Sequence, residues 1–203
     1  MSFWTHFIGT IQFRSRSYEE VEAILGKPTL FRDVWTWDDD EERTEEEIHR
    51  RQEELWKPAF VAWENGTGMP MGSEGSINWR YVDTSRENDH VFGEGTLVAI
   101  EGDLRDFGCD IEDIRKSLLW FRSKCFDLGA RESVLRIQTD WWYNFIIYGC
   151  RDHLIVHAFK KDELVLSFSW HYERREEQWH TELLFNNLAE TSDLKHLIPE
   201  IIL

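Results

Sequence analysis

The first residues of the chain alternate between two faces, which is the pattern of a β-strand. Apolar or small side chains occupy every second position from Phe3 to Phe13, and this period of two predicts an opening strand. Ser17 and Glu20, three residues apart, have the spacing of a helix capping box. The apolar stripe that follows them ends at Gly26, so a short helix is expected after the strand.

Two strands and one long helix are predicted in the middle of the chain. Within 71–81, a loop of small residues leads into one strand, and the apolar run within 95–104 is typical of a buried strand. The polar turn at 83–90 separates the two and indicates a hairpin. Asp110 can cap a helix that runs to about residue 128, because apolar side chains recur there with helical spacing.

The remainder of the chain is rich in β-forming residues. Turn residues separate four such runs, and this arrangement predicts an antiparallel meander. The expected strands cover residues 132–139, 141–148, 153–159 and 163–172. After them, residues 182–203 are predicted to form a C-terminal helical segment.

Residues 29–63 differ from both flanks, because a dense acidic run is followed by basic residues. Thr44 and Glu47 have the spacing of a second capping box, and acids in the first turn with bases in the last turn suit the helix dipole. An exposed acidic helix is therefore expected at about 44–56. The short segment 59–63 is compatible with a strand or with the end of this insertion.

The predicted order of elements is strand, helix, strand, strand, helix, strand, followed by further strands. This order is that of a ferredoxin-like βαββαβ unit. We therefore expect a single α+β domain over residues 1–203. It would consist of a ferredoxin-like core, extended by the antiparallel meander and carrying an acidic helical insertion at 29–63.

The chain is strongly acidic, with 39 Asp and Glu against 23 Lys and Arg and a formal net charge of −16. Such a field repels nucleic-acid phosphates and anionic lipid surfaces, so neither is an expected partner. It would instead accelerate encounter with a basic protein surface. The alternative is that the charge only keeps the protein in solution.

No catalytic, metal or cofactor motif stands out in the sequence. Three Cys without a CxxC pair suit neither a disulfide framework nor a zinc site. His153 and His157 lie four apart, but on a strand this spacing separates them by about 13 Å, too far to share one ion. Neither a signal-peptide pattern nor a run of about 18 apolar residues occurs. We expect a cytoplasmic protein without a cofactor or an assigned catalytic residue.

Aromatic and acidic residues gather around the predicted insertion. The 11 Trp exceed what a core of this size needs, and amphipathic aromatic side chains often anchor interfaces. Rings beside carboxylates would suit a basic, partly apolar partner. The partner-binding candidates are Trp35, Trp37, Asp38, Asp39, Asp40, Glu45, Glu46 and Trp56. Packing of the rings under a purely solvated insertion is the alternative.

Two short motifs are candidates for a ligand site. The glycine- and serine-rich loop 72–76 could present backbone amides to an anion, but it lacks the Lys of a P-loop, and a structural turn is the favoured interpretation. The segment 103–106 places two carboxylates and a guanidinium at a strand end, for acid–base work, for a divalent ion or for an Asp–Arg corner that fixes the loop. The ligand-binding candidates are Ser73, Glu74, Ser76, Asp103, Arg105 and Asp106.

Three segments, 3–11, 72–76 and 102–106, resemble a group of uncharacterised proteins that phages and prophages encode. The resemblance covers under a fifth of the chain and brings no settled activity with it. It implies a small phage-borne or mobile-element protein that works inside a bacterial cell. The acidic stretch from Asp38 to Glu47 departs from the shorter members of the group.

The combined pattern favours a protein that acts by binding. The leading hypothesis is an acidic inhibitor or immunity-type protein, of phage or mobile-element origin, that masks a basic protein surface. One alternative is a small-ligand or phosphate-ester enzyme that uses the loop 72–76 with the segment 103–106. Another alternative is a virion or scaffold component, which would assemble with itself.

Overall fold

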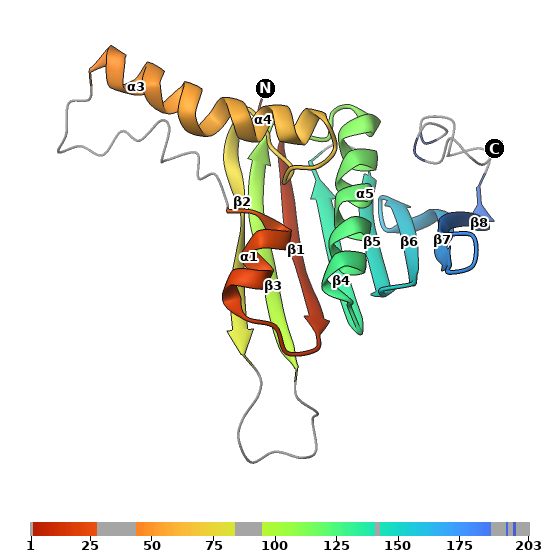
Figure 1. The fold of residues 1–203 in the computed structure, drawn as a ribbon. Helices are drawn as coiled ribbons and strands as arrows, with labels where there is room; N and C mark the ends of the chain where they lie inside the picture. Colours follow the sequence, from red (N-terminus) through yellow and green to blue (C-terminus); the bar gives the residue numbers. More distant parts are fainter. Residues whose placement is uncertain are drawn as a thin grey trace.

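An eight-stranded antiparallel sheet forms the centre of the protein (Figure 1). The computed structural model describes residues 2–27, 44–83, 95–140 and 143–187, together with Leu194 and Leu197. Along the sheet the strands follow the order β2-β3-β1-β4-β5-β6-β7-β8, and all neighbours are antiparallel. The strands are β1 (Trp4–Phe13), β2 (Glu74–Asp83), β3 (Thr96–Arg105), β4 (Glu132–Thr139), β5 (Tyr143–Cys150), β6 (His153–Lys160), β7 (Glu163–Glu173) and β8 (Gln178–Asn186).

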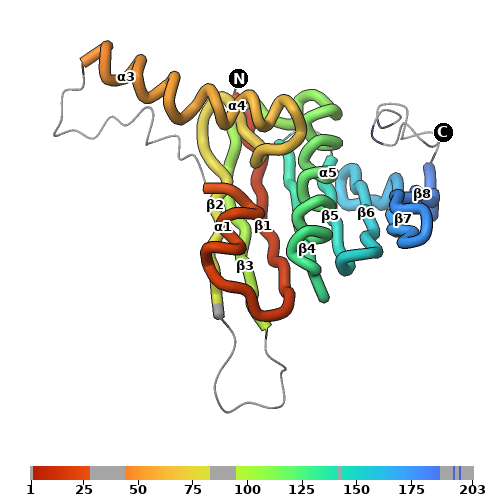
Figure 2. The backbone as a smooth tube through the Cα atoms, viewed as in Figure 1, coloured from red at the N-terminus to blue at the C-terminus, as the bar shows by residue number. Residues whose placement is uncertain are grey.

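The described helices lie on one face of the sheet (Figures 1 and 2). The helix α1 (Tyr18–Leu25) follows β1, and α5 (Ile111–Leu128) connects β3 to β4. A third helical stretch precedes β2 and crosses the ends of the first strands. It consists of α3 (Glu45–Arg51), the π-helical segment η1 (Gln52–Trp56) and α4 (Lys57–Glu64).

Buried and exposed side chains alternate along β1, and this alternation shows which face of the sheet the helices cover. Phe7 and Ile11 are buried toward the helices, whereas Ile8, between them, is 64% exposed on the opposite face. The helix α5 supplies much of the cover, and Leu118 and Phe121 are among its buried side chains. Burial of apolar side chains between helices and sheet is the main stabilising contribution to such a two-layer arrangement.

Local capping signals begin and end the helices where the sequence predicts. The hydroxyl of Ser17 accepts from the amide of Glu20, and the Glu20 carboxylate accepts from the amide of Ser17, so the capping box is complete. The carboxylate of Asp110 accepts from an amide in the first turn of α5, and Gly129 ends that helix in the left-handed conformation. Each contact satisfies a backbone group that a helix end otherwise leaves unpaired.

The mixed α and β class, the hairpin of β2 and β3, and the antiparallel meander from β4 to β7 are confirmed. The helix expected at 44–56 is also present, with Thr44 as its N-cap. It continues to Glu64 as α4, so the alternative of a strand at 59–63 is wrong. Of the expected insertion at 29–63, residues 29–43 lie outside the described part of the chain.

The predicted helical segment at 182–203 is wrong for its first five residues. Residues 182–186 belong to β8, which pairs with β7 across a register shift between Ser167 and Phe168. Helix propensity is a weak local preference, and backbone pairing with an existing strand edge overrides it. Most of the segment from residue 188 onward lies outside the described residues.

Candidate functional site

The loop 72–76 and the segment 103–106 form one structural corner at an end of the sheet. Glu74 and Ser76 are the first and third residues of β2, not loop residues as expected. The antiparallel register places Glu74 opposite Arg105 and Ser76 opposite Asp103. Two motifs about thirty positions apart in the sequence are therefore direct neighbours.

The charged and polar groups of this corner bind each other. The Arg105 guanidinium forms an ion pair with Glu74, and its Nη2 donates to the hydroxyl of Ser2 at 2.7 Å. The hydroxyl of Ser73 donates to the Asp106 carboxylate at 3.0 Å, and the Ser73 amide donates to the Arg105 carbonyl, also at 3.0 Å. Arg105 also forms a longer ion pair with Asp106 at 3.8 Å, so Arg and hydroxyl donors occupy the Glu74 and Asp106 carboxylates that a ligand or ion would need.

Asp103 points to the opposite face of the sheet from the helices. Its carboxylate binds Nδ1 of His6 on the neighbouring strand, and both side chains remain about half exposed. Within the described residues, no group of three or more His, Cys, Asp or Glu is arranged to hold a metal ion. The corner therefore offers one exposed histidine–aspartate pair and a set of internally satisfied charges.

A second candidate site is the helical stretch from Glu45 to Glu64, which extends beyond the edge of the sheet (Figure 1). The segments α3 and η1 contain no buried residue, and Trp63 in α4 is the first side chain that enters the core. The exposed part carries charges of both signs, with acidic residues in the first turn of α3 and His49, Arg50 and Arg51 in its last turn. This stretch is attached to the body mainly through its C-terminal end.

The same stretch exposes apolar side chains between its charges. Leu55 is 44% exposed, Phe60 37% and Val61 50%. Trp56 is half-buried, and its ring stacks on Phe60 with the centroids 4.9 Å apart. Glu53 lies beside them and forms an ion pair with Lys57 at 2.9 Å. This exposed helix therefore carries apolar side chains among charged ones, with acidic residues in excess over basic ones, and we call it the acidic arm (Glu45–Glu64).

Three of the predicted partner-binding residues, Glu45, Glu46 and Trp56, lie on the acidic arm. The other five candidates, Trp35, Trp37, Asp38, Asp39 and Asp40, lie outside the described residues. Leu55, Phe60 and Val61 were missed by the sequence analysis. The signal for Phe60 and Val61 is the apolar run at 59–63, which is compatible with a buried strand as well as with an exposed helix, and Leu55 lies outside this run.

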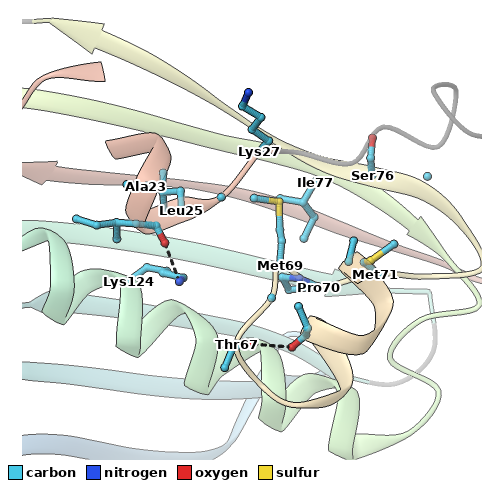
Figure 3. Close-up of a pocket in the computed structure, with 16 residues that line it drawn as sticks. Ala23, Leu25, Lys27, Thr67, Met69, Pro70, Met71, Ser76, Ile77 and Lys124 are labelled. Carbon is cyan, nitrogen blue, oxygen red and sulfur yellow. Dashed lines mark hydrogen bonds between the residues drawn. The ribbon is translucent and has the colours of Figure 1, made fainter. Parts of the chain in front are cut away.

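A cavity of about 300 Å³ lies where α1, α4 and β2 meet (Figure 3). Its wall mixes polar and apolar groups about equally, and the segment 67–71 after α4 contributes Met69 and Met71. Methionine side chains adapt their shape to a contact more readily than branched ones. The volume is at the lower end of the range for small-molecule pockets.

Two lysines, Lys27 and Lys124, line this cavity, and the more buried one is Lys124 of α5. Its Nζ donates to the Ile24 carbonyl at 2.8 Å, one of the free carbonyls at the C-terminal end of α1 (Figure 3). Burial lowers the pKa of the Lys124 ammonium, partly offset by the charge of Asp127. Lys124 therefore both caps a helix and places a cation beside the cavity. No sequence motif marks Lys124, Met69 or Met71.

Cys125 lies in an environment that suppresses thiol reactivity. Cys125 is fully buried on the sheet side of α5, and burial raises the pKa of its thiol to about 12. A thiol with such a pKa is not a nucleophile at neutral pH. Cys109, Cys125 and Cys150 are all free of disulfide bonds.

No protein-family model, no curated protein and no solved structure was found to match the chain. The arguments about function therefore rest on the geometry of this structure. None of the helices in the described residues is long and apolar enough to cross a membrane.

Proposed function

We propose that the protein is a binding protein whose acidic arm engages a basic, partly apolar surface of another protein. The observation that carries this proposal is the exposure of Leu55, Phe60 and Val61 on a helix that extends from the body. Exposed apolar surface costs about 25 cal/mol per Å² relative to burial, and a partner that covers it recovers this free energy. Aromatic anchors within a polar rim are the usual arrangement of protein interfaces.

Charge supplies the second support. The net charge of −16 attracts a cationic surface over long distances, and Glu45, Glu46, Glu53 and Glu54 place carboxylates beside the apolar groups. Electrostatic complementarity of this kind raises the association rate, whereas the apolar contacts slow dissociation. In an inhibitor or immunity-type protein of phage or mobile-element origin, the arm would cover the functional surface of a basic protein inside the bacterial cell.

A capture experiment from a bacterial lysate tests the proposal. The wild-type protein is expected to retain a basic protein at low salt and to release it progressively as salt increases. The double substitution Phe60→Ser/Val61→Ser should abolish capture, because it removes the apolar anchors without changing the charge. The control Ile8→Ser changes an even more exposed apolar residue on the open face of the sheet and should leave capture intact. If both variants capture the partner equally well, the acidic arm is not the binding surface.

A second candidate function follows from the cavity between α1, α4 and β2. A small ligand with an apolar body and an anionic group would place the body against Met69 and Met71 and the anion near Lys124. The loop 72–76 takes part through Gly75 and Ser76, which line the same space. This arrangement favours a protein that binds a small ligand. The ligand would then lie in the cavity and not beside Asp103 and Asp106, where the sequence placed it.

Thermal-shift measurements with small aromatic and aliphatic carboxylic acids test this second function. A ligand that binds only the folded state must raise the unfolding temperature. Ala59→Leu fills part of the cavity, so it should remove the shift without unfolding the protein. Asp103→Ala should retain the shift, because Asp103 lies on the opposite face of the sheet. If Asp103→Ala abolishes the shift and Ala59→Leu retains it, the ligand binds at the corner formed by the segments 72–76 and 103–106 and not in the cavity.

We also propose that the first four strands with α1 and α5 form a ferredoxin-like βαββαβ core. The supporting observations are the order β2-β3-β1-β4, the antiparallel pairing of these strands and the position of both connecting helices on one face. In this interpretation, the acidic arm is an insertion between the first helix and the second strand of the core.

A further inference from the structure

Arginines gather in one open concavity at the end of the sheet where β1 and α5 both finish. The hollow has a volume of about 680 Å³. Five of the chain's 23 Lys and Arg line it, and only two acidic residues, Glu20 and Asp152, share the lining. The arginines are Arg14, Arg16, Arg131, Arg151 and Arg174. In a protein with a net charge of −16, this is a local reversal of sign.

The arginines come from four separate parts of the chain. Arg14 and Arg16 follow β1, Arg131 precedes β4, Arg151 lies in the turn between β5 and β6, and Arg174 lies in the turn between β7 and β8. A pattern along the sequence therefore cannot reveal the cluster. Only the alignment of these strand ends in one sheet brings the five arginines to one hollow.

Both acidic groups of the hollow are already engaged. The Glu20 carboxylate accepts from the amide of Ser17 in the capping box. Asp152 forms ion pairs with Arg174 and, at 3.7 Å, with Arg151. The two carboxylates balance only two of the five arginines, so the lining keeps an excess of positive charge.

Three of the arginines have structural contacts, and two do not. Arg16 donates to the Asp127 carbonyl at 3.1 Å and so caps the end of α5. Arg151 lies over the ring of Phe126, and Arg174 binds Asp152. Arg14 and Arg131 are exposed, and their guanidinium groups make no hydrogen bond or ion pair with any residue that the structure describes. Like charges that converge without a counter-ion favour an anion between them.

We propose that this arginine hollow binds a small phosphate-bearing polyanion. The planar guanidinium fork matches phosphate oxygens with two parallel hydrogen bonds, and Arg14 and Arg131 have their donors available. A volume of about 680 Å³ accommodates a chain of two or three linked phosphates with room for water. The ligand would join β1 to β4 through the two arginines and leave the structural arginines in place.

The overall charge favours a small polyanion over nucleic acid. A long phosphate backbone would extend beyond the hollow and meet the field of the acidic surface. A ligand that fits within the hollow lies within about one Debye length, roughly 8 Å at physiological ionic strength, of the arginines. The local positive potential therefore acts on the whole of a small ligand but on only part of a long one.

Calorimetric titration with inorganic tripolyphosphate tests the proposal. The wild-type protein is expected to bind it, and Arg14→Ala and Arg131→Ala should each weaken binding by about tenfold or more, as expected for the loss of charge-assisted hydrogen bonds. Arg131→Lys keeps the charge but not the fork and should give an intermediate affinity. Both arginines lack described side-chain partners, so the unfolding temperature of each variant should stay close to that of the wild type.

The control is Arg136→Ala, which removes an equally exposed arginine from the open face of β4, outside the hollow. It should leave the affinity unchanged. The proposal is overturned if the wild-type protein does not bind tripolyphosphate, or if the control weakens binding as much as Arg131→Ala does. A single-stranded oligonucleotide is titrated in parallel. Tighter binding of the oligonucleotide, with the same arginine dependence, would also overturn the proposal, because the site would then belong to a nucleic acid.

Discussion

At the scale of single residues, two glycines show how differently the same residue type can be constrained. Gly75 and Gly129 both have a positive φ, +85° and +69°. A Cβ on Gly129 would meet no atom within 4 Å, whereas a Cβ on Gly75 would lie 1.9 Å from the carbonyl oxygen of Asp103. Gly129 is therefore required only for its backbone conformation, and Gly75 also for the close approach of β2 to β3.

This difference predicts unequal effects of the same substitution. Gly129→Ala should reduce the free energy of unfolding by about 1 kcal/mol, the cost of a left-handed conformation with a Cβ. Gly75→Ala should reduce it by about 3 kcal/mol or more, because the backbone of the corner must also move. Urea unfolding followed by circular dichroism measures both values. Equal losses would show that β2 and β3 are not packed at this distance.

At the scale of secondary structure, a proline explains the irregular turn of the acidic arm. Pro58 has no amide hydrogen, so the carbonyl four residues before it loses its helical donor. Directly before Pro58 the helix widens into the π-helical segment η1, where the amide of Lys57 donates to the carbonyl of Gln52. The wide turn absorbs the defect and allows α3 to continue the direction of α4.

Pro58→Ala is expected to convert the π turn into regular α-helix. The restored amide donor and the removal of proline should stabilise the arm locally by up to about 3 kcal/mol. Hydrogen exchange of the amides between Glu53 and Ala62 would slow accordingly, as measured by nuclear magnetic resonance. The control Val61→Ala improves helix propensity only slightly and restores no donor, so it should leave the exchange near η1 unchanged. Unaltered exchange in Pro58→Ala would show that the proline does not cause the π turn.

At the scale of the whole molecule, the described charges are not uniformly mixed. Acidic residues outnumber basic ones on the acidic arm, and five arginines line one hollow at an end of the sheet. The two surfaces suit ligands of opposite charge. Binding of a polyanion in the arginine hollow and binding of a basic protein at the acidic arm can therefore be tested independently in the same protein.

Local interactions determined what the sequence alone could predict about the fold. The capping box at Ser17, the helix from Asp110 to Gly129 and the alternation in β1 each depend on residues a few positions apart. These predictions are confirmed. The segment 182–186 was misread because its residues tolerate a helix locally, and only the available edge of β7 makes it a strand.

The candidate sites depended on contacts that no short-range pattern encodes. The sequence identified the segments 72–76 and 103–106 and the acidic run, because glycine-rich and charged runs are visible locally. Strand register then decided that Glu74 and Arg105 bind each other, and packing decided that Lys124 borders a cavity. The convergence of Arg14, Arg131 and Arg151 belongs to the tertiary structure alone, since pairing of distant strands sets which chain segments share one end of a sheet.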